Sequence, residues 1–382
     1  MKILKRLSKW ILLPLSIFIL LLYIFNYDYL LKAVRTIYLQ GHTTAFLKDY
    51  EEFENRVIEN ESPQPWALHK EYNSAKETEI LKAINATNKT IAYVIIKNDS
   101  IWFENYFEEF DKDSKSNSFS MAKSMISAML GKAITEGKIK SLDQKVSDFY
   151  PEFNKGYSAN MTVGDLSSMA SGLNWDEAYY SPFSVTTRAY FDDDLESVIL
   201  GLEGVEEPGK SYKYLSGNTQ LLGMIIQKAT GQNLSNYLSE KFWKPMGAEH
   251  SALWQVDSEE NGLEKAYCCV ASNARDFARF GKLYQQYGKW NGQQILDSAF
   301  VAKSITPRFK ESPEYGYGWW LKTVNNKSFF MMRGHLGQYV IVQPEDNVII
   351  VRLGHLKSAD EGIGAFTSDI QTYIEEAYKM ME

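Results

Sequence analysis

The sequence predicts an α/β (α+β) protein, in which one antiparallel sheet is flanked by helices and an all-helical subdomain interrupts its strands. Three observations support this fold class. Runs rich in β-branched and aromatic residues form a hairpin over 90–107, where the globular region opens. Two further hairpins lie near the end of the chain, over 317–353. The intervening 142–290 shows helical patterns with many breaks, so the sheet is assembled from distant parts of the chain.

The N-terminus combines basic residues with an apolar run. Its basic residues are Lys2, Lys5, Arg6 and Lys9. A mainly apolar segment over 10–25 follows, without a small-x-small cleavage site after it. We expect 1–30 to be a cytoplasmic stub and a transmembrane signal anchor, with the rest periplasmic or extracellular by the positive-inside rule. A cleaved signal peptide and a buried helix of a soluble protein are the alternatives.

The segment over 31–88 looks mainly helical and polar, with a break at 61–65. It predicts a helical stalk or N-terminal extension. The globular domain is expected over 89–382, opening with strands over 90–96 and 101–107.

A buried helix is predicted from Ser120, and Gly137 provides its natural end. Apolar residues recur along it at i+4 spacing. The two rows are Met121, Met125, Met129 and Ala133, and Ala122, Ile126, Leu130 and Ile134.

Shorter elements follow this helix. They are a helix at 161–166 capped by Thr162, a loop over 171–177, a turn at 208–210, helices over 221–229 and 274–287, strands over 317–323, 329–333, 338–343 and 348–353, and a last helix from about 365 to 381. The charged residues Arg275, Asp276 and Arg279 are expected on a solvated helix face.

Composition limits the function classes. The 382 residues carry a formal net charge of −7, which argues against nucleic acid as a partner. Aromatic residues make up 14% of the chain, which favours a ring-lined core or pocket. Cys268 and Cys269 are neighbours, and a bond between them would be strained, so we expect two buried packing residues without a disulfide. No metal site is expected, because too few Cys and His lie at ligand spacing.

Ser120 and Lys123 are three residues apart and share one face of the predicted helix. A serine hydroxyl needs an adjacent base to become a nucleophile, and a lysine serves when burial lowers its pKa. S-x-x-K occurs by chance about once in a chain of this length. The alternative is therefore a helix N-cap serine followed by a snorkelling lysine.

Two patterns downstream favour the catalytic interpretation of Ser120 over the N-cap interpretation. They are Tyr214-Leu215-Ser216, and His335-Leu336-Gly337 at the head of a predicted strand. With this ordered set the chain resembles the serine β-lactamase/penicillin-recognising superfamily. It is most similar to the class C β-lactamase-related branch of esterases, D-aminopeptidases and 6-aminohexanoate-dimer hydrolases. The likeness runs from about residue 88 to the end and includes the phrases at 169–173, 271–281 and 315–320. It implies a β-lactamase/transpeptidase-like fold and a catalytic domain over 89–382.

The resemblance implies a role for each matched residue. Ser120 attacks a carbonyl carbon to form an acyl-enzyme, and Lys123 and Tyr214 share the base role. Ser216 hydrogen-bonds Lys123 and relays the proton to the leaving group. The backbone N–H groups of Ser120 and Gln338 form the oxyanion hole. No metal or cofactor is implied.

The chain departs from β-lactamases at His335, where they carry the lysine of Lys-Thr-Gly. That lysine helps to hold the substrate carboxylate, whereas a histidine is mostly neutral at pH 7. We therefore expect weak β-lactam binding and cleavage of another small acyl substrate. His335, Gly337, Tyr179 and Trp175 are the expected substrate-binding residues. Aromatic packing is the alternative for Tyr179 and Trp175, and a satisfied strand-end histidine for His335.

The sequence thus predicts a membrane-tethered serine hydrolase that cleaves an ester or a short amide. Its expected partners are a small-molecule or short-peptide acyl substrate and the membrane. One alternative is a true β-lactamase or D,D-peptidase. The other is a non-catalytic binding module or sensor with the same fold.

Overall fold

The main layer of the protein is a seven-stranded sheet in the order β10-β11-β12-β13-β3-β4-β2. The computed structural model describes residues 2–359 and 365–382, with side chains from Trp10 onward. Neighbouring strands are antiparallel, except that β2 and β4 run parallel. The strands are β2 (Ala67–Leu68), β3 (Thr90–Lys97), β4 (Ser100–Tyr106), β10 (Trp320–Val324), β11 (Lys327–Gly334), β12 (Gln338–Gln343) and β13 (Val348–Gly354). The predicted sheet, assembled from both ends of the domain, is confirmed.

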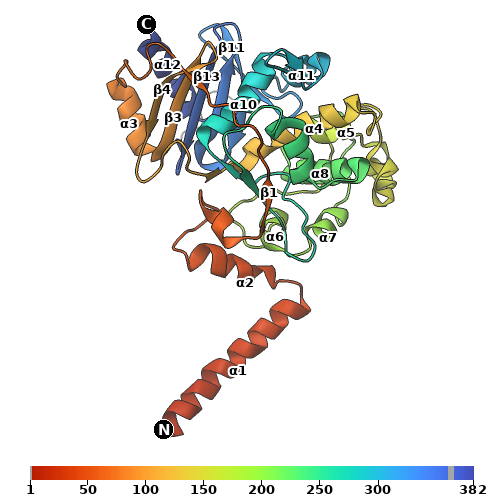
Figure 1. The fold of residues 1–382 in the computed structure, drawn as a ribbon. Helices are drawn as coiled ribbons and strands as arrows, with labels where there is room; N and C mark the ends of the chain where they lie inside the picture. Colours follow the sequence, from red (N-terminus) through yellow and green to blue (C-terminus); the bar gives the residue numbers. More distant parts are fainter. Residues whose placement is uncertain (1, 360–364) are drawn as a thin grey trace.

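Helices cover both faces of this sheet and build a second lobe beside it (Figure 1). The covering helices are α3 (Glu79–Thr87), α10 (Ala274–Gln285) and α12 (Ser368–Met381). The helical lobe contains α4 (Ala122–Thr135), α5 (Val163–Ser167), α6 (Val185–Phe191), α7 (Leu195–Leu200), α8 (Ser216–Thr230) and α9 (Leu234–Leu238). The short helix α11 (Ser298–Ser304) packs on α4.

Alternation along the central strands separates two cores. Tyr93 and Ile95 of β3 pack in the core that also contains residues of α3 and α12. Val94 and Ile96 point the other way, into the large core shared with α10 and the helical lobe. Both faces of β3 are therefore buried, which explains why its sequence is a nearly continuous apolar run.

The predicted Ser120 helix is present, but its first turn is tighter than an α-helix. A 3₁₀ turn, η3 (Phe119–Met121), leads into α4. Helix α4 packs on α8, and its first ten residues are all buried. The turn itself lies against β11 and β12. Ser120 is thus held where the helical lobe meets the sheet.

The prediction of a helical stalk over 31–88 is wrong in its secondary structure. This segment contains two strands that extend sheets of the globular domain. β1 (Asn55–Ile58) pairs with β6 (Ala252–Gln255) in a small sheet of order β1-β6-β7-β5. The other strands of that sheet are β5 (Ser116–Asn117) and β7 (Val270–Ser272). β2 lies parallel to β4 at the edge of the main sheet. Short, half-polar strands such as β1 carry too little periodicity to be recognised in the sequence.

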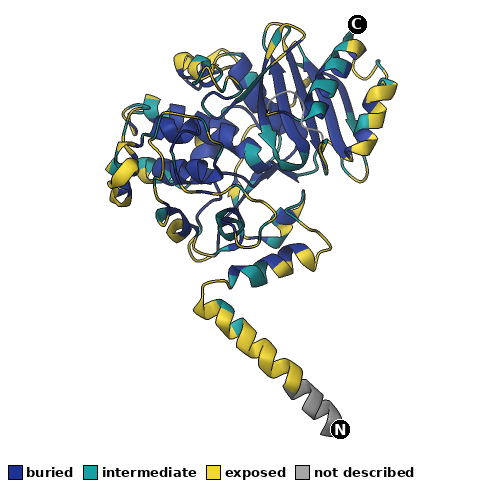
Figure 2. Cartoon of the chain, turned by 180° about the vertical axis from the view of Figure 1, so that it is seen from behind, coloured by how far each residue is buried: buried dark blue, intermediate teal, exposed yellow. Residues whose placement is uncertain are grey.

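The N-terminal helices do not include a straight membrane span. α1 (Lys2–Ile24) is mostly exposed along the part whose side chains are described (Figure 2). Over residues 2–359 and 365–382, no single helix is both long and apolar enough to cross a bilayer. Trp10–Ile24 and Tyr29–Tyr38 reach the required length and hydropathy only as a pair, bent by 116°. The latter consists of α2 (Tyr29–Ala33) and the π-helix η1 (Val34–Tyr38).

The predicted solvated face of α10 is wrong. Asp276 and Arg279 are 0% and 1% exposed, and Arg279 Nε donates to Asp276 Oδ1 at 2.8 Å. Arg275 Nε donates to Glu104 Oε2 of β4 at 3.0 Å, and its Nη1 lies 3.6 Å from Glu249 Oε2. Asp276 on the same helix and the distant Glu104 and Glu249 neutralise the two arginines, which makes burial of the charges tolerable.

Candidate active site

Ser120 is presented by a strained turn at the head of α4. Phe119 has a left-handed backbone with φ of 45°. The Asn117 side chain accepts the Phe119 backbone N–H at 2.9 Å. Ser118 joins the turn to β7, because its N–H donates to the Val270 carbonyl at 2.7 Å and its Oγ accepts from the Val270 N–H at 3.1 Å. These bonds fix the direction in which the Ser120 side chain leaves the backbone.

Lys123 is buried directly beside this hydroxyl. It is 3% exposed, and its Nζ lies 3.0 Å from Ser120 Oγ and 2.9 Å from the Tyr267 carbonyl oxygen. Burial lowers the pKa of Lys123 to about 8, against the opposing effect of the Glu177 carboxylate. An amine of this pKa is partly unprotonated near neutral pH and can accept a proton from the serine.

Tyr214 completes the group around the lysine. Lys123 Nζ lies 5.1 Å from the centre of the Tyr214 ring, which leans on Trp320 with ring centres 5.3 Å apart. Burial and then the Glu177 charge raise the pKa of Tyr214, and interaction with the Ser120 hydroxyl only partly opposes them. The phenol is therefore protonated at neutral pH, which disfavours the base role that Tyr214 was expected to share with Lys123.

The predicted hydrogen bond between Ser216 and Lys123 is not formed. Ser216 Oγ donates to Glu177 Oε1 at 2.5 Å, and its backbone N–H donates to Glu177 Oε2 at 2.8 Å. Ser216 is the first residue of α8, so the carboxylate takes up an otherwise unpaired N–H at the positive end of that helix. The Ser216 hydroxyl proton is therefore engaged in a charge-assisted bond to the carboxylate.

Glu177 is the site residue that sequence reasoning missed. Besides Ser216 it accepts from Trp175 Nε1 at 2.8 Å and from the Tyr179 hydroxyl at 2.5 Å. Three residues from two distant segments thus donate four hydrogen bonds to one carboxylate. Only the short spacing among Trp175, Glu177 and Tyr179 is visible in the sequence, and nothing there links this loop to Ser216.

The turn at 335–337 forms the opposite wall. Leu336 and Gly337 both have left-handed backbones, with φ of 61° and 85°. Buried Arg352 holds their carbonyl groups, with Nη1 at 3.1 Å from Leu336 O and 2.8 Å from Gly337 O. A Cβ at position 337 would lie 2.3 Å from this nitrogen, so glycine is required there. The turn leads directly into Gln338, the first residue of β12.

His335 lies between two aromatic rings. It stacks on Tyr179, with ring centres 5.4 Å apart, and meets Phe119 edge-on at 5.6 Å. Burial and the nearby Lys357 charge lower the pKa of His335 to about 4, so the ring is neutral at pH 7. Its Nε2 is buried and has no hydrogen-bond partner among the described residues. The alternative of a strand-end histidine with its hydrogen bonds satisfied does not fit this environment.

A cavity of about 380 Å³ opens beside the nucleophile. Four of the predicted site residues line it: Ser120, Tyr179, Ser216 and His335. Trp175 and Gly337 are not part of its lining. Trp175 is 3% exposed behind Glu177, so it supports the site from the core, as the packing alternative proposed.

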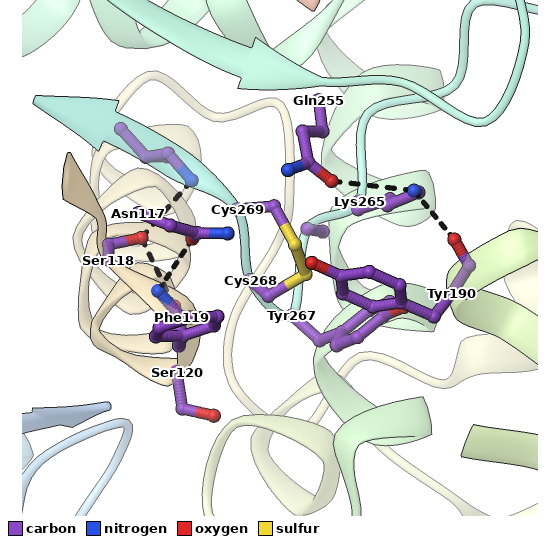
Figure 3. Close-up of a disulfide and its surroundings, with 12 residues drawn as sticks. Asn117, Ser118, Phe119, Ser120, Tyr190, Gln255, Lys265, Tyr267, Cys268 and Cys269 are labelled. Carbon is purple, nitrogen blue, oxygen red and sulfur yellow. Dashed lines mark hydrogen bonds between the residues drawn. A yellow bond between two sulfur atoms is a disulfide. The ribbon is translucent and has the colours of Figure 1, made fainter. Parts of the chain in front are cut away.

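The two cysteines are bonded, contrary to prediction. Cys268 and Cys269 form a disulfide that is buried next to Tyr267 and close to Ser120 (Figure 3). Their burial was predicted correctly. The left-handed backbone of Cys269, with φ of 74°, turns the two side chains toward each other, whereas the sequence argument assumed an extended strand. Tyr267, whose carbonyl receives the Lys123 ammonium, immediately precedes this linked pair.

No cluster of three or more His, Cys, Asp or Glu side chains within residues 2–359 and 365–382 has the arrangement of a metal site. The residues that gather around Ser120 are instead a lysine, phenols, a carboxylate and a neutral imidazole. Such groups can activate a hydroxyl, position a carbonyl compound and pass protons.

Comparison with known proteins gives a consistent result. A profile of the Beta-lactamase family matches residues 80–368. The 6-aminohexanoate-dimer hydrolase of Paenarthrobacter ureafaciens is 25% identical over 294 residues, covering 71% of this chain and 74% of that protein.

Solved structures share the fold. A putative 6-aminohexanoate-dimer hydrolase from Bacillus anthracis superposes with a TM-score of 0.70 at 20% identity, covering 87% of this chain and 91% of that one. A family VIII carboxylesterase gives 0.61 at 17% identity, covering 85% and 100%. The resemblance drawn from the three short patterns is thereby confirmed. The chain belongs to the Beta-lactamase family of penicillin-recognising serine hydrolases, which includes amidases and esterases as well as β-lactamases.

Proposed function

We propose that this protein hydrolyses an ester or a short amide through an acyl-enzyme on Ser120. The observation that carries the proposal is the 3.0 Å contact between Lys123 Nζ and Ser120 Oγ, with the lysine buried and its pKa lowered to about 8. A buried lysine that only packed would gain nothing from a lowered pKa, whereas a general base needs one.

In the first half-reaction Lys123 accepts the Ser120 proton while Oγ bonds to the substrate carbonyl carbon. The bond to the leaving oxygen or nitrogen then breaks, and the proton passes to that atom. The protonated Tyr214 phenol beside Ser120 is suited to relay it. Water repeats the sequence on the acyl-enzyme, which releases the acid and restores the serine.

The oxyanion of each tetrahedral intermediate is assigned to two backbone N–H groups, those of Ser120 and Gln338. The rigid turns that carry both residues support this assignment, because such donors act only when they are held in place. A donor of this kind contributes about 2.7–4 kcal/mol.

The site favours ester or amide cleavage over β-lactam turnover. β-Lactams carry a carboxylate, and His335, whose pKa is about 4, offers that group no positive charge at neutral pH. The test is hydrolysis of p-nitrophenyl acetate measured beside nitrocefin. Turnover of the acetate ester with little of nitrocefin supports the proposal. Faster nitrocefin turnover would favour a β-lactamase, and ligand binding without any turnover a sensor.

Glu177→Gln is expected to move the acid limb of the kcat/KM–pH profile to lower pH. The Glu177 carboxylate stabilises the Lys123 ammonium, so its removal lowers the pKa of Lys123 further below about 8 and frees the base earlier. The profile for p-nitrophenyl acetate between about pH 5 and pH 9 measures this shift. Asp176→Asn, which removes the neighbouring exposed carboxylate, is the control. An unmoved limb in Glu177→Gln would exclude this electrostatic role.

We also propose that α1 attaches the protein to a membrane, with the catalytic domain outside the cytoplasm. Its support is a run of exposed apolar side chains: Trp10, Ile11, Leu12, Leu13, Leu15, Ile17, Phe18, Leu20, Leu21, Ile24 and Phe25. The full-length protein is expected to float with phosphatidylglycerol-containing vesicles in a density gradient. The triple variant Ile11→Asp, Leu12→Asp and Leu15→Asp should stay at the bottom. Wild-type protein that does not float would contradict this attachment.

A further inference from the structure

The cavity beside Ser120 extends well beyond the catalytic residues. One part of its wall comes from residues 179–191, which include α6, and another from residues 18–45 near the N-terminus. Figure 3 labels five lining residues at the inner end: Phe119, Ser120, Tyr190, Tyr267 and Cys268. Its volume of about 380 Å³ is within the usual range for small-molecule sites and exceeds what an acetyl group fills.

The lining is uncharged throughout the described residues. Among the 26 side chains around the cavity there is no Asp, Glu, Lys or Arg. The part contributed by the N-terminal helices is aliphatic and aromatic: Phe18, Leu22, Leu30, Leu31, Ala33, Val34, Ile37 and Tyr38. A charged group placed here would lose its hydration without a partner, which excludes charged acyl groups from this wall.

The catalytic end of the cavity has an unpaired polar atom. His335 Nε2 is buried without a partner, and its ring lies beside Phe119, the residue before the nucleophile. The ester or amide group of a substrate can occupy that end, and the apolar wall can receive the hydrocarbon attached to it. The acyl chain rather than the leaving group gains from such a wall, because it stays bound to Ser120 through both half-reactions.

We infer that this cavity binds an aliphatic acyl chain, and that the substrates are esters or amides of fatty acids of about eight or more carbons. The inference rests on the proposed acyl-enzyme function and names its substrate class. Burial of one methylene group favours binding by about fourfold, so even partial burial of a chain outweighs small differences in reactivity.

The test uses full-length protein and p-nitrophenyl acetate, butyrate, octanoate and decanoate below their micelle concentrations. We expect kcat/KM to rise at least about tenfold from acetate to decanoate. Equal or falling values along the series would overturn the inference while Ser120-dependent acetate hydrolysis kept the proposed function intact. Absence of Ser120-dependent hydrolysis of every ester would overturn both.

A matched pair of variants tests where the acyl chain of the substrate binds. Val34 lines the cavity and is 45% exposed, and Leu39 on the next turn is 74% exposed and outside the lining. Val34→Asp should lower the decanoate-to-acetate ratio of kcat/KM at least about fivefold, because it brings a charge to the apolar wall. Leu39→Asp makes a similar chemical change and should leave the ratio unaltered. An unchanged ratio in Val34→Asp, or an equal fall in both variants, would show that the chain binds elsewhere.

Discussion

Replacing Ser120 with alanine is expected to lower kcat/KM for p-nitrophenyl esters by at least about 10⁴-fold. Without the hydroxyl no acyl-enzyme forms, and only direct attack of water in the remaining binding site is left. Initial rates with substrate well below KM measure the loss. The fold should persist, because a small polar side chain at the head of α4 is removed and no large cavity is created.

Ser124→Ala is the matched control for this experiment. Ser124 lies one turn further along α4, is 2% exposed, and donates to the Gly318 carbonyl at 2.6 Å. Its loss should lower the free energy of unfolding by about 1 kcal/mol and leave kcat/KM within about threefold. If Ser120→Ala kept turnover within about tenfold of wild type, Ser120 would not be the nucleophile.

Lys123→Met is expected to lower kcat/KM by about 10² to 10⁴-fold, the usual contribution of a general base. Methionine approximates the length of lysine but cannot accept the Ser120 proton. In wild type the rate should rise with pH as the ammonium loses its proton, with a midpoint near the Lys123 pKa of about 8. The variant should lack this rise. The measurement is the kcat/KM–pH profile of both proteins.

Stability separates this catalytic loss from misfolding. Lys123 is 3% exposed, and burial disfavours its charged form, so an apolar replacement should fold at least as stably. Lys132→Met, at the other end of α4, is the control, because within residues 2–359 and 365–382 Lys132 Nζ donates only to the Ile295 carbonyl, at 3.0 Å. A Lys123→Met enzyme with near-normal rates and an unchanged pH midpoint would assign the base role to another group.

Sequence periodicity was sufficient for the elements that build the site. Strands β3, β4, β12 and β13 and helix α4 all contain long apolar runs or rows, and these patterns come from burial in the two cores. Because α4 follows β4 and the 335–337 turn precedes β12, placing these elements in one fold also brought Ser120, Lys123 and His335 together. The proximity of these three residues therefore followed once the fold was recognised.

Contacts between residues far apart in the sequence could not be predicted from periodicity. Glu177 binds Ser216 across 39 positions, and no local spacing predicts such a pair. The same limitation explains the α10 error, since Arg275 is neutralised by Glu104, 171 residues away. When the sequence of a helix is considered alone, its charged residues appear solvent-exposed, because the carboxylates that pair with them lie elsewhere in the sequence. The role expected for Ser216 failed for this reason.

The cysteine pair shows a different limit. We expected no bond, on the assumption that Cys268 and Cys269 continue an extended strand. A left-handed backbone at Cys269 reverses that assumption, and a non-glycine residue gives no sign of this conformation in the sequence.

Fluorophosphonate labelling followed by peptide mass spectrometry tests the central claim most directly, because the probe reacts only with an activated hydroxyl. A single adduct on Ser120 is predicted, with a labelling rate that rises with pH around the Lys123 pKa of about 8 and is lost in Lys123→Met. An adduct on any other residue, or labelling of Ser120 that is independent of Lys123, would contradict the account.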